Sequence, residues 1–163
     1  MDQAVLVRTQ EIVVIYYLGR MCAGPRSATL LHRMRVLLLE DEESLAGAVQ
    51  RALVRDGMKV TVTRSVDDAI AALAAAHFDV VLADVHLGSG GPLREGLDLV
   101  RHVKRVGGPP VIVYTGSQEH GLVRDALLAG AVDCLFKDRI DPVGLARTLR
   151  TLATDSGPGT DVP

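Results

Sequence analysis

The chain has 163 residues, of which 48% are hydrophobic and 3% aromatic, and its formal net charge at pH 7 is −2. This length fits one domain, and the hydrophobic content is high enough to bury a core rather than leave the chain disordered. Few aromatic side chains argue against a protein that stacks nucleobases, and the slightly acidic balance argues against one that binds a phosphate backbone. We therefore expect no nucleic-acid partner.

Cysteines and apolar runs narrow the class further. The two cysteines, Cys22 and Cys134, are too few for a disulfide framework and lack a zinc-binding spacing. The apolar run at residues 12–18 is far shorter than the roughly 20 residues that a membrane-spanning helix needs. Asp2 and Glu11 lie before or at its start, where a signal peptide would carry positive charge. We expect a cytoplasmic protein that does not engage a membrane.

Short apolar segments then alternate with helical patterns over most of the chain. Residues 36–39 form a continuous apolar run, which is typical of a strand buried on both faces. An apolar stripe with helical spacing follows and ends before Gly57, and residues 60–62 indicate a second strand. Ser65 is a candidate helix N-cap, and the alanine-rich residues 69–76 favour a helix after it.

The second half of the chain continues the alternation of apolar strands, turn residues and helices. The predicted elements are a strand at 79–83, a loop at 88–92, a helix at 95–106, a strand at 111–114, a helix at 122–129, a strand at 132–136 and a last helix around 145–152. Short apolar strands that alternate with helices predict a parallel sheet covered on both faces.

We expect an α/β fold, a doubly wound five-stranded parallel sheet in the flavodoxin-like order 2-1-3-4-5. We expect this domain to span residues 34–153 and residues 154–163 to form a disordered tail. Residues 1–33 lie outside the regular pattern. They are either a disordered arm or the product of a mis-assigned start, with Met34 as the true beginning, and we favour the second interpretation.

Polar side chains end four of the predicted strands: Glu40 and Asp41 the first, Asp84 the third, Thr115 the fourth and Lys137 the fifth. The carboxyl ends of parallel strands share one edge of the sheet, where such folds bind ligands. Clustered carboxylates repel one another without a cation, and Mg²⁺ prefers a few carboxylate oxygens together with phosphate oxygens. A lysine ammonium and a threonine hydroxyl beside them would complete a site for a tetrahedral anion.

These residues suit phosphoryl transfer to Asp84, whose carboxylate would act as the nucleophile and form an aspartyl phosphate. Each residue alone has a plainer interpretation, such as an acidic helix start, a turn-forming aspartate or a solvated lysine. Their order, each at its own strand end, favours the functional interpretation. We expect an autocatalytic phosphoacceptor that is not a turnover enzyme.

Residues 34–153 resemble a bacterial response regulator receiver domain of the stand-alone, chemotaxis-receiver-like kind. The matching segments are 39–42 (Leu-Glu-Asp-Glu), 79–84 (Asp-Val-Val-Leu-Ala-Asp), 114–116 (Tyr-Thr-Gly) and 129–137, which ends in Leu-Phe-Lys. The resemblance implies that a histidine kinase or a histidine phosphotransfer domain phosphorylates Asp84, and that Thr115 and Lys137 bind the phosphoryl oxygens. It also implies a Mg²⁺ site made by the backbone carbonyl of His86 and the carboxylates of Glu40, Asp41 and Asp84.

The chain departs from the usual receiver pattern at several positions. Asp138 stands where the family has a proline, so we expect a trans Lys137–Asp138 bond. Cys134 replaces an aromatic switch residue, and Gly88 lies where a proline is common. The loop after Asp84 is enlarged. These departures leave the implied anion site complete but alter the relay of the signal to the surface.

Two other functions compete with this interpretation. A flavodoxin-like FMN binder would need a phosphate-binding loop rich in Ser, Thr and Gly after the first strand, but residues 40–43 are all acidic and repel phosphate. A phosphorylation-independent, receiver-like protein-binding module stays open because of Cys134 and Asp138. About ten residues follow the last predicted helix, too few for a DNA-binding domain, so we expect output by contact with an unknown downstream protein or by onward phosphotransfer.

Overall fold

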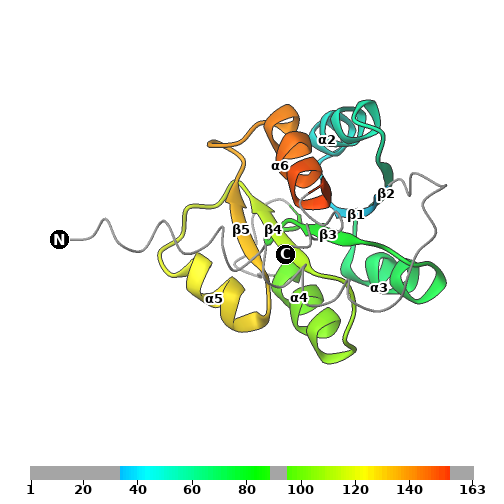
Figure 1. Cartoon of the computed structure of the whole chain (residues 1–163). Helices are drawn as coiled ribbons and strands as arrows, with labels where there is room; N and C mark the ends of the chain where they lie inside the picture. The colour runs from blue at the N-terminus through cyan, green and yellow to red at the C-terminus, as the bar shows by residue number, and fades with distance from the viewer. Residues whose placement is uncertain (1–33, 89–94, 155–163) are drawn as a thin grey trace, which may run out of the picture.

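The computed structural model describes residues 34–88 and 95–154, which form alternating strands and helices (Figure 1). The strands are β1 (Arg35–Leu39), β2 (Lys59–Thr63), β3 (Val80–Ala83), β4 (Val111–Thr115) and β5 (Asp133–Phe136). The helices are α2 (Glu43–Arg55), α3 (Val66–Ala75), α4 (Glu95–Arg105), α5 (Leu122–Ala129) and α6 (Pro142–Thr154). The predicted extension at 1–33 and the predicted tail beyond Thr154 lie outside the described residues, so these domain boundaries stay predictions.

The strands form one five-stranded parallel sheet in the order β2-β1-β3-β4-β5. The predicted α/β fold and strand order are therefore confirmed. From β1 the chain moves outward to β2, and it then crosses back to place β3 on the other side of β1. Because the connections after β1 and β3 lead to opposite faces of the sheet, the ends of these two strands form the topological switch point of the fold, where such sheets bind ligands.

The sheet is covered on both faces, as Figure 1 shows: α2 and α6 lie on one face, and α3, α4 and α5 on the other. Alternate side chains of each strand enter opposite cores. Leu37 and Val81 pack on the side of α3, α4 and α5, whereas Leu38 and Leu82 pack on the side of α2 and α6. Burial of each such side chain contributes about 1.5–3 kcal/mol, so the central strands hold the residues at their ends firmly.

Local sequence explains where α3 begins. Ser65 caps α3, because its hydroxyl accepts a hydrogen bond from the Asp68 N–H at 3.1 Å, as the N-cap pattern predicts. Two acidic residues in the first turn of α3 also stabilise the helix, because their negative charge lies near the positive end of the helix dipole.

No helix in the described part of the chain combines the length and the apolar character needed to cross a membrane.

Gly96, near the start of α4, packs directly on the backbone at the end of β3. A Cβ atom at this position would lie 1.8 Å from the carbonyl oxygen of Asp84. The Gly96 N–H also donates a hydrogen bond to the carbonyl oxygen of Val85 at 3.1 Å. Only glycine permits this approach, so α4 begins in contact with the segment that carries Asp84.

We expect Gly96→Ala to lower the free energy of unfolding by about 3 kcal/mol, because the new methyl group meets backbone atoms that cannot move aside locally. Gly47→Ala in α2 is the matched control. Its methyl group would meet only the flexible end of Arg51, and alanine favours the helix by about 0.5–1 kcal/mol. Urea unfolding of both variants checks this, and equal effects would contradict it.

Candidate functional site

Three charged residues from separate strand ends meet at the carboxyl edge of the sheet. Glu40 follows β1, Asp84 follows β3 and Lys137 follows β5. The Lys137 Nζ atom lies 2.6 Å from Glu40 Oε2 and 2.6 Å from Asp84 Oδ2. Glu40 is 2% exposed and Asp84 is 8% exposed. The structure thus brings together three of the residues that the strand ends indicated.

Burial and the shared ammonium set the charge of this cluster. Burial raises the pKa of Glu40, and the hydrogen bond and charge of Lys137 offset this only in part. Burial by itself would lower the pKa of Lys137, but hydrogen bonds to Asp84 and Glu40 raise it above its ordinary value of 10.5. Lys137 therefore stays cationic at neutral pH and balances carboxylates that would otherwise repel each other.

Asp41 makes a different contact. Its Oδ2 atom accepts a hydrogen bond from the Gly88 N–H at 2.7 Å, so it ties the end of β1 to the loop that follows Asp84. Gly88 has a φ of 88°, in the left-handed region. Proline could supply neither this backbone conformation nor the N–H donor, which explains why glycine fits here. The glycine is evident from the sequence, but this bond is not, because it joins residues 47 positions apart.

Thr115 is the last residue of β4 and is 1% exposed. Its carbonyl oxygen accepts a hydrogen bond from the Lys137 N–H at 2.9 Å, which places the two residues side by side. Its hydroxyl accepts a hydrogen bond from the Ser117 N–H at 3.3 Å. The threonine therefore lies beside the charged cluster, while its hydroxyl contacts the following turn.

His86 lies in the loop after β3, where its backbone N–H and its ring both make contacts. Its N–H donates to Asp84 Oδ1 at 3.3 Å, and its ring Nε2 lies 3.1 Å from Glu119 Oε1. This second contact links the loop after β3 to the loop after β4. It could not be anticipated, because the two residues lie 33 positions apart and no local pattern pairs them.

The remaining departures from the receiver pattern have local consequences. Cys134 is half-buried, and burial, together with the charge of Asp133, raises the pKa of its thiol to about 11. It is therefore a small neutral side chain and not a nucleophile at neutral pH. Asp138 accepts a hydrogen bond from Gln118 Nε2 at 2.7 Å. The described residues contain no cis peptide bond, so the predicted trans bond before Asp138 is confirmed.

The family model of the response regulator receiver domain matches residues 36–150. The chain belongs to this family. Receiver domains are signalling modules of two-component systems rather than turnover enzymes, and the family implies that the module accepts a phosphoryl group.

Relatives and solved structures agree with the family. The receiver is 36% identical over 105 residues to the transcriptional regulatory protein CutR of Streptomyces coelicolor, covering 64% of this chain and 46% of CutR. It is 32% identical over 105 residues to the transcriptional regulatory protein DltR of Streptococcus agalactiae, covering 64% of this chain and 45% of DltR. The chain thus spans less than half the length of these curated relatives.

Among solved structures, the receiver resembles a CheY-like response regulator receiver domain protein from Methanospirillum hungatei. The TM-score is 0.65 at 22% identity, and the match covers 78% of this chain and 99% of the other. Because the identity is low, this likeness supports the receiver fold and not a particular activity.

We expect Lys137→Met to lower the free energy of unfolding at neutral pH by about 3 kcal/mol, because it leaves two buried carboxylates without their cation. The loss should shrink as the pH falls through the raised pKa of Glu40, because this carboxyl then takes up a proton and no longer needs a cation. The sign follows because a pKa that is raised in the folded state adds stability at low pH, which is lost as the pH rises through that pKa.

Urea unfolding of this variant across acidic to neutral pH provides the measurement. Lys59→Met, at an exposed position in β2, is the control and should change the free energy of unfolding by less than about 0.5 kcal/mol. A loss in Lys137→Met that does not depend on pH would show that the ammonium does not balance Glu40.

Proposed function

We propose that this receiver accepts a phosphoryl group on Asp84 from a histidine kinase or a histidine phosphotransfer domain, with Mg²⁺ as cofactor. The observation that carries the proposal is the Asp84 carboxylate, which follows β3 at the carboxyl edge of the sheet with the Lys137 ammonium 2.6 Å away. A carboxylate held next to a cation at a ligand-binding edge suits transfer of an anionic group.

In the proposed reaction, an oxygen of Asp84 attacks the phosphorus of a phosphohistidine from the side opposite the nitrogen. A P–O bond forms and the P–N bond breaks, and the bonding electron pair leaves with the histidine nitrogen. Oδ1 is the freer oxygen, because it accepts the 3.3 Å bond from the His86 N–H, whereas Oδ2 is held by Lys137 at 2.6 Å. We therefore assign the nucleophile to Oδ1.

Lys137 would neutralise charge on the transferred group, and the Thr115 hydroxyl would turn from the Ser117 N–H to bind a phosphoryl oxygen. Both residues already lie at the same edge, joined by their backbone hydrogen bond. Burial of Thr115 and Glu40 excludes water from this side of the group, which strengthens each electrostatic contact.

The oxygen donors at this edge fit Mg²⁺ in kind, since two buried carboxylates lie beside Asp41 and the His86 carbonyl. When bound, Mg²⁺ would neutralise the phosphoryl oxygens during transfer. Within residues 34–88 and 95–154, no three side chains of Asp, Glu, His or Cys already form a metal cluster. Only Oδ2 of Asp41 accepts the hydrogen bond from Gly88, so Oδ1 would be the oxygen offered to the metal.

The phosphorylation-independent module is the second candidate. Cys134 supports it, because a small side chain at the aromatic switch position can relay little movement from the phosphorylation site. The intact cluster of Glu40, Asp84 and Lys137 supports phosphorylation instead. The downstream partner and output, whether protein contact or onward phosphotransfer, belong to the same proposal. We place the protein in the cytoplasm.

We expect incubation with Mg²⁺ and acetyl phosphate to add one phosphoryl group, located on Asp84 by mass spectrometry, and Asp84→Asn to abolish the addition. Asp138→Asn removes an exposed carboxylate next to Lys137 and is the matched control, expected to react like the natural chain. Unchanged uptake by Asp84→Asn would refute the assignment. Absence of uptake from both acetyl phosphate and a phosphorylated histidine phosphotransfer domain would favour the phosphorylation-independent module.

A further inference from the structure

A groove of about 740 Å³ lies between α4 and α5. One wall is a single stripe of α4, and the other is the C-terminal half of α5. The lining residues are Leu97, Arg101, Lys104 and Arg105 from α4, and Asp125, Leu128 and Ala129 from α5. Because α4 starts beside Asp84 and runs back along the sheet, its cationic end lies away from the phosphorylation edge.

The charge of the groove is opposite to the overall charge of the described residues. The described residues carry more Asp and Glu than Lys and Arg, yet three of the lining residues are cationic and one is anionic. Arg101 makes an exposed ion pair with Asp98 at 2.7 Å, which water screens and a competing carboxylate can replace. The groove therefore presents positive charge to an incoming ligand.

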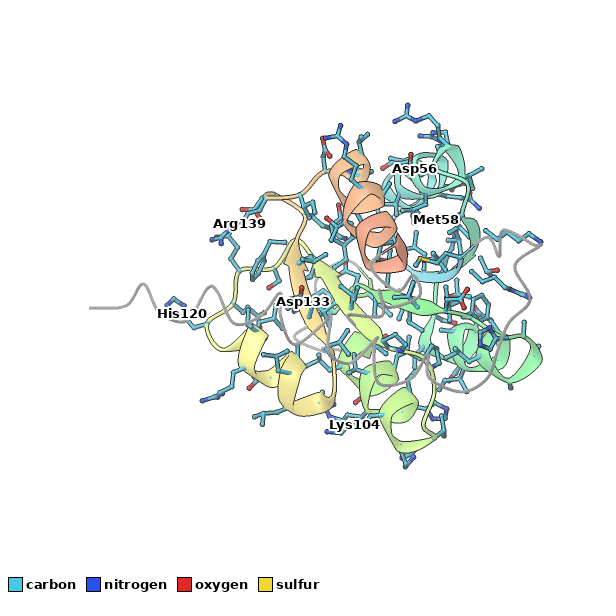
Figure 2. The ribbon with its side chains drawn as sticks, viewed as in Figure 1. Asp56, Met58, Lys104, His120, Asp133 and Arg139 are labelled. Atoms are coloured by element: carbon cyan, nitrogen blue, oxygen red, sulfur yellow. The ribbon has the colours of Figure 1, made fainter. Side chains whose placement is uncertain are left out.

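Lys104 is held across the end of α5 (Figure 2). A Cβ atom on Gly130 would lie 2.4 Å from Lys104 Cδ, so the lysine stem packs where a larger residue would collide. The aliphatic part of Lys104 therefore packs against the end of α5, and the residue as a whole stays exposed, so its charge is accessible to a ligand.

The groove also has an apolar side. Leu128 is 71% exposed, although leucine favours burial, and it lies beside buried Leu97 and Ala129. Val123 and Leu127 of α5 are also exposed, so Leu128 belongs to a larger apolar surface, and apolar surface bordered by charged side chains is a common feature of protein-binding sites. A partner side chain placed on Leu128 would remove apolar surface from water.

We propose that this groove binds an acidic amphipathic helix of a partner protein, with an apolar side chain on Leu128 and carboxylates facing the three cations. Arg101, Lys104 and Arg105 have the spacing i, i+3 and i+4, which matches carboxylates on one face of a second helix. Nucleic acid fits less well, because a phosphate backbone would leave the apolar surface of Leu128 in contact with water. The inference does not depend on phosphorylation and concerns a surface away from the cluster of Glu40, Asp84 and Lys137.

The test uses the full chain and a fluorescent synthetic peptide with leucine on one helical face and glutamate flanking it. Fluorescence anisotropy should give saturable binding, and Leu128→Ser and Arg105→Glu should each weaken it about tenfold or more. Leu127→Ser and Arg55→Glu are the matched controls. Leu127→Ser alters the neighbouring exposed leucine of α5. Arg55→Glu makes the same charge change as Arg105→Glu, but at the last residue of α2 instead of α4. The peptide affinity of both controls should stay within about twofold of that of the natural chain.

Several outcomes would overturn the proposal. Equal affinity of the peptide for all four variants would show that it binds elsewhere. Amide chemical shift changes on peptide addition that are confined to β5 and α6 would show the same. Equal binding of a peptide with glutamine in place of glutamate would remove the electrostatic basis. Self-association that Leu128→Ser abolishes, without peptide binding, would make a second copy of the chain the occupant. Melting curves of the variants ensure that lost binding is not lost folding.

Discussion

The ammonium of Lys137 between two buried carboxylates is the interaction on which the candidate site depends. Glu40 and Asp84 lie 97 and 53 positions from Lys137 in the chain, so only the sheet can bring them together. Burial makes the negative charge of Glu40 costly, as its raised pKa shows, and the cation offsets part of that cost. The charges of the cluster therefore balance only when the ends of β1, β3 and β5 lie side by side.

The surrounding packing protects this arrangement. Leu39 and Ala83, at the ends of β1 and β3, are completely buried, so the residues that follow them start from fixed backbone positions. Gly96 adds a direct contact between α4 and the carbonyl of Asp84. One consequence concerns the groove: its α4 wall is the continuation of a helix that begins against Asp84. A change at the end of β3 would therefore reach this wall through covalent and van der Waals contacts.

The departures from the usual receiver pattern alter contacts around the cluster without removing its charges. Gly88 supplies an N–H donor to Asp41, and Asp138 bonds to Gln118 across two loops. His86 and Glu119 form a second bridge between loops. Cys134, by contrast, offers a small neutral thiol where the family has a large ring. Polar contacts therefore join these loops. In β5, the side chain at position 134 is smaller than the aromatic ring that the family usually has there.

The sequence by itself determined the fold class, the strand order and the residues at the strand ends. Short apolar runs and turn residues are local signals, and the few topologies open to a parallel sheet put Glu40, Asp84, Thr115 and Lys137 on one edge. Tertiary structure alone decided which side chains meet. The strand-end pattern treats Glu40 and Asp41 alike, but Glu40 turns to Lys137 and Asp41 to Gly88. The sequence also did not reveal the contact between His86 and Glu119 or the groove between α4 and α5. Both bring together residues that are distant in the sequence, and their contact depends on tertiary packing and not on local preference.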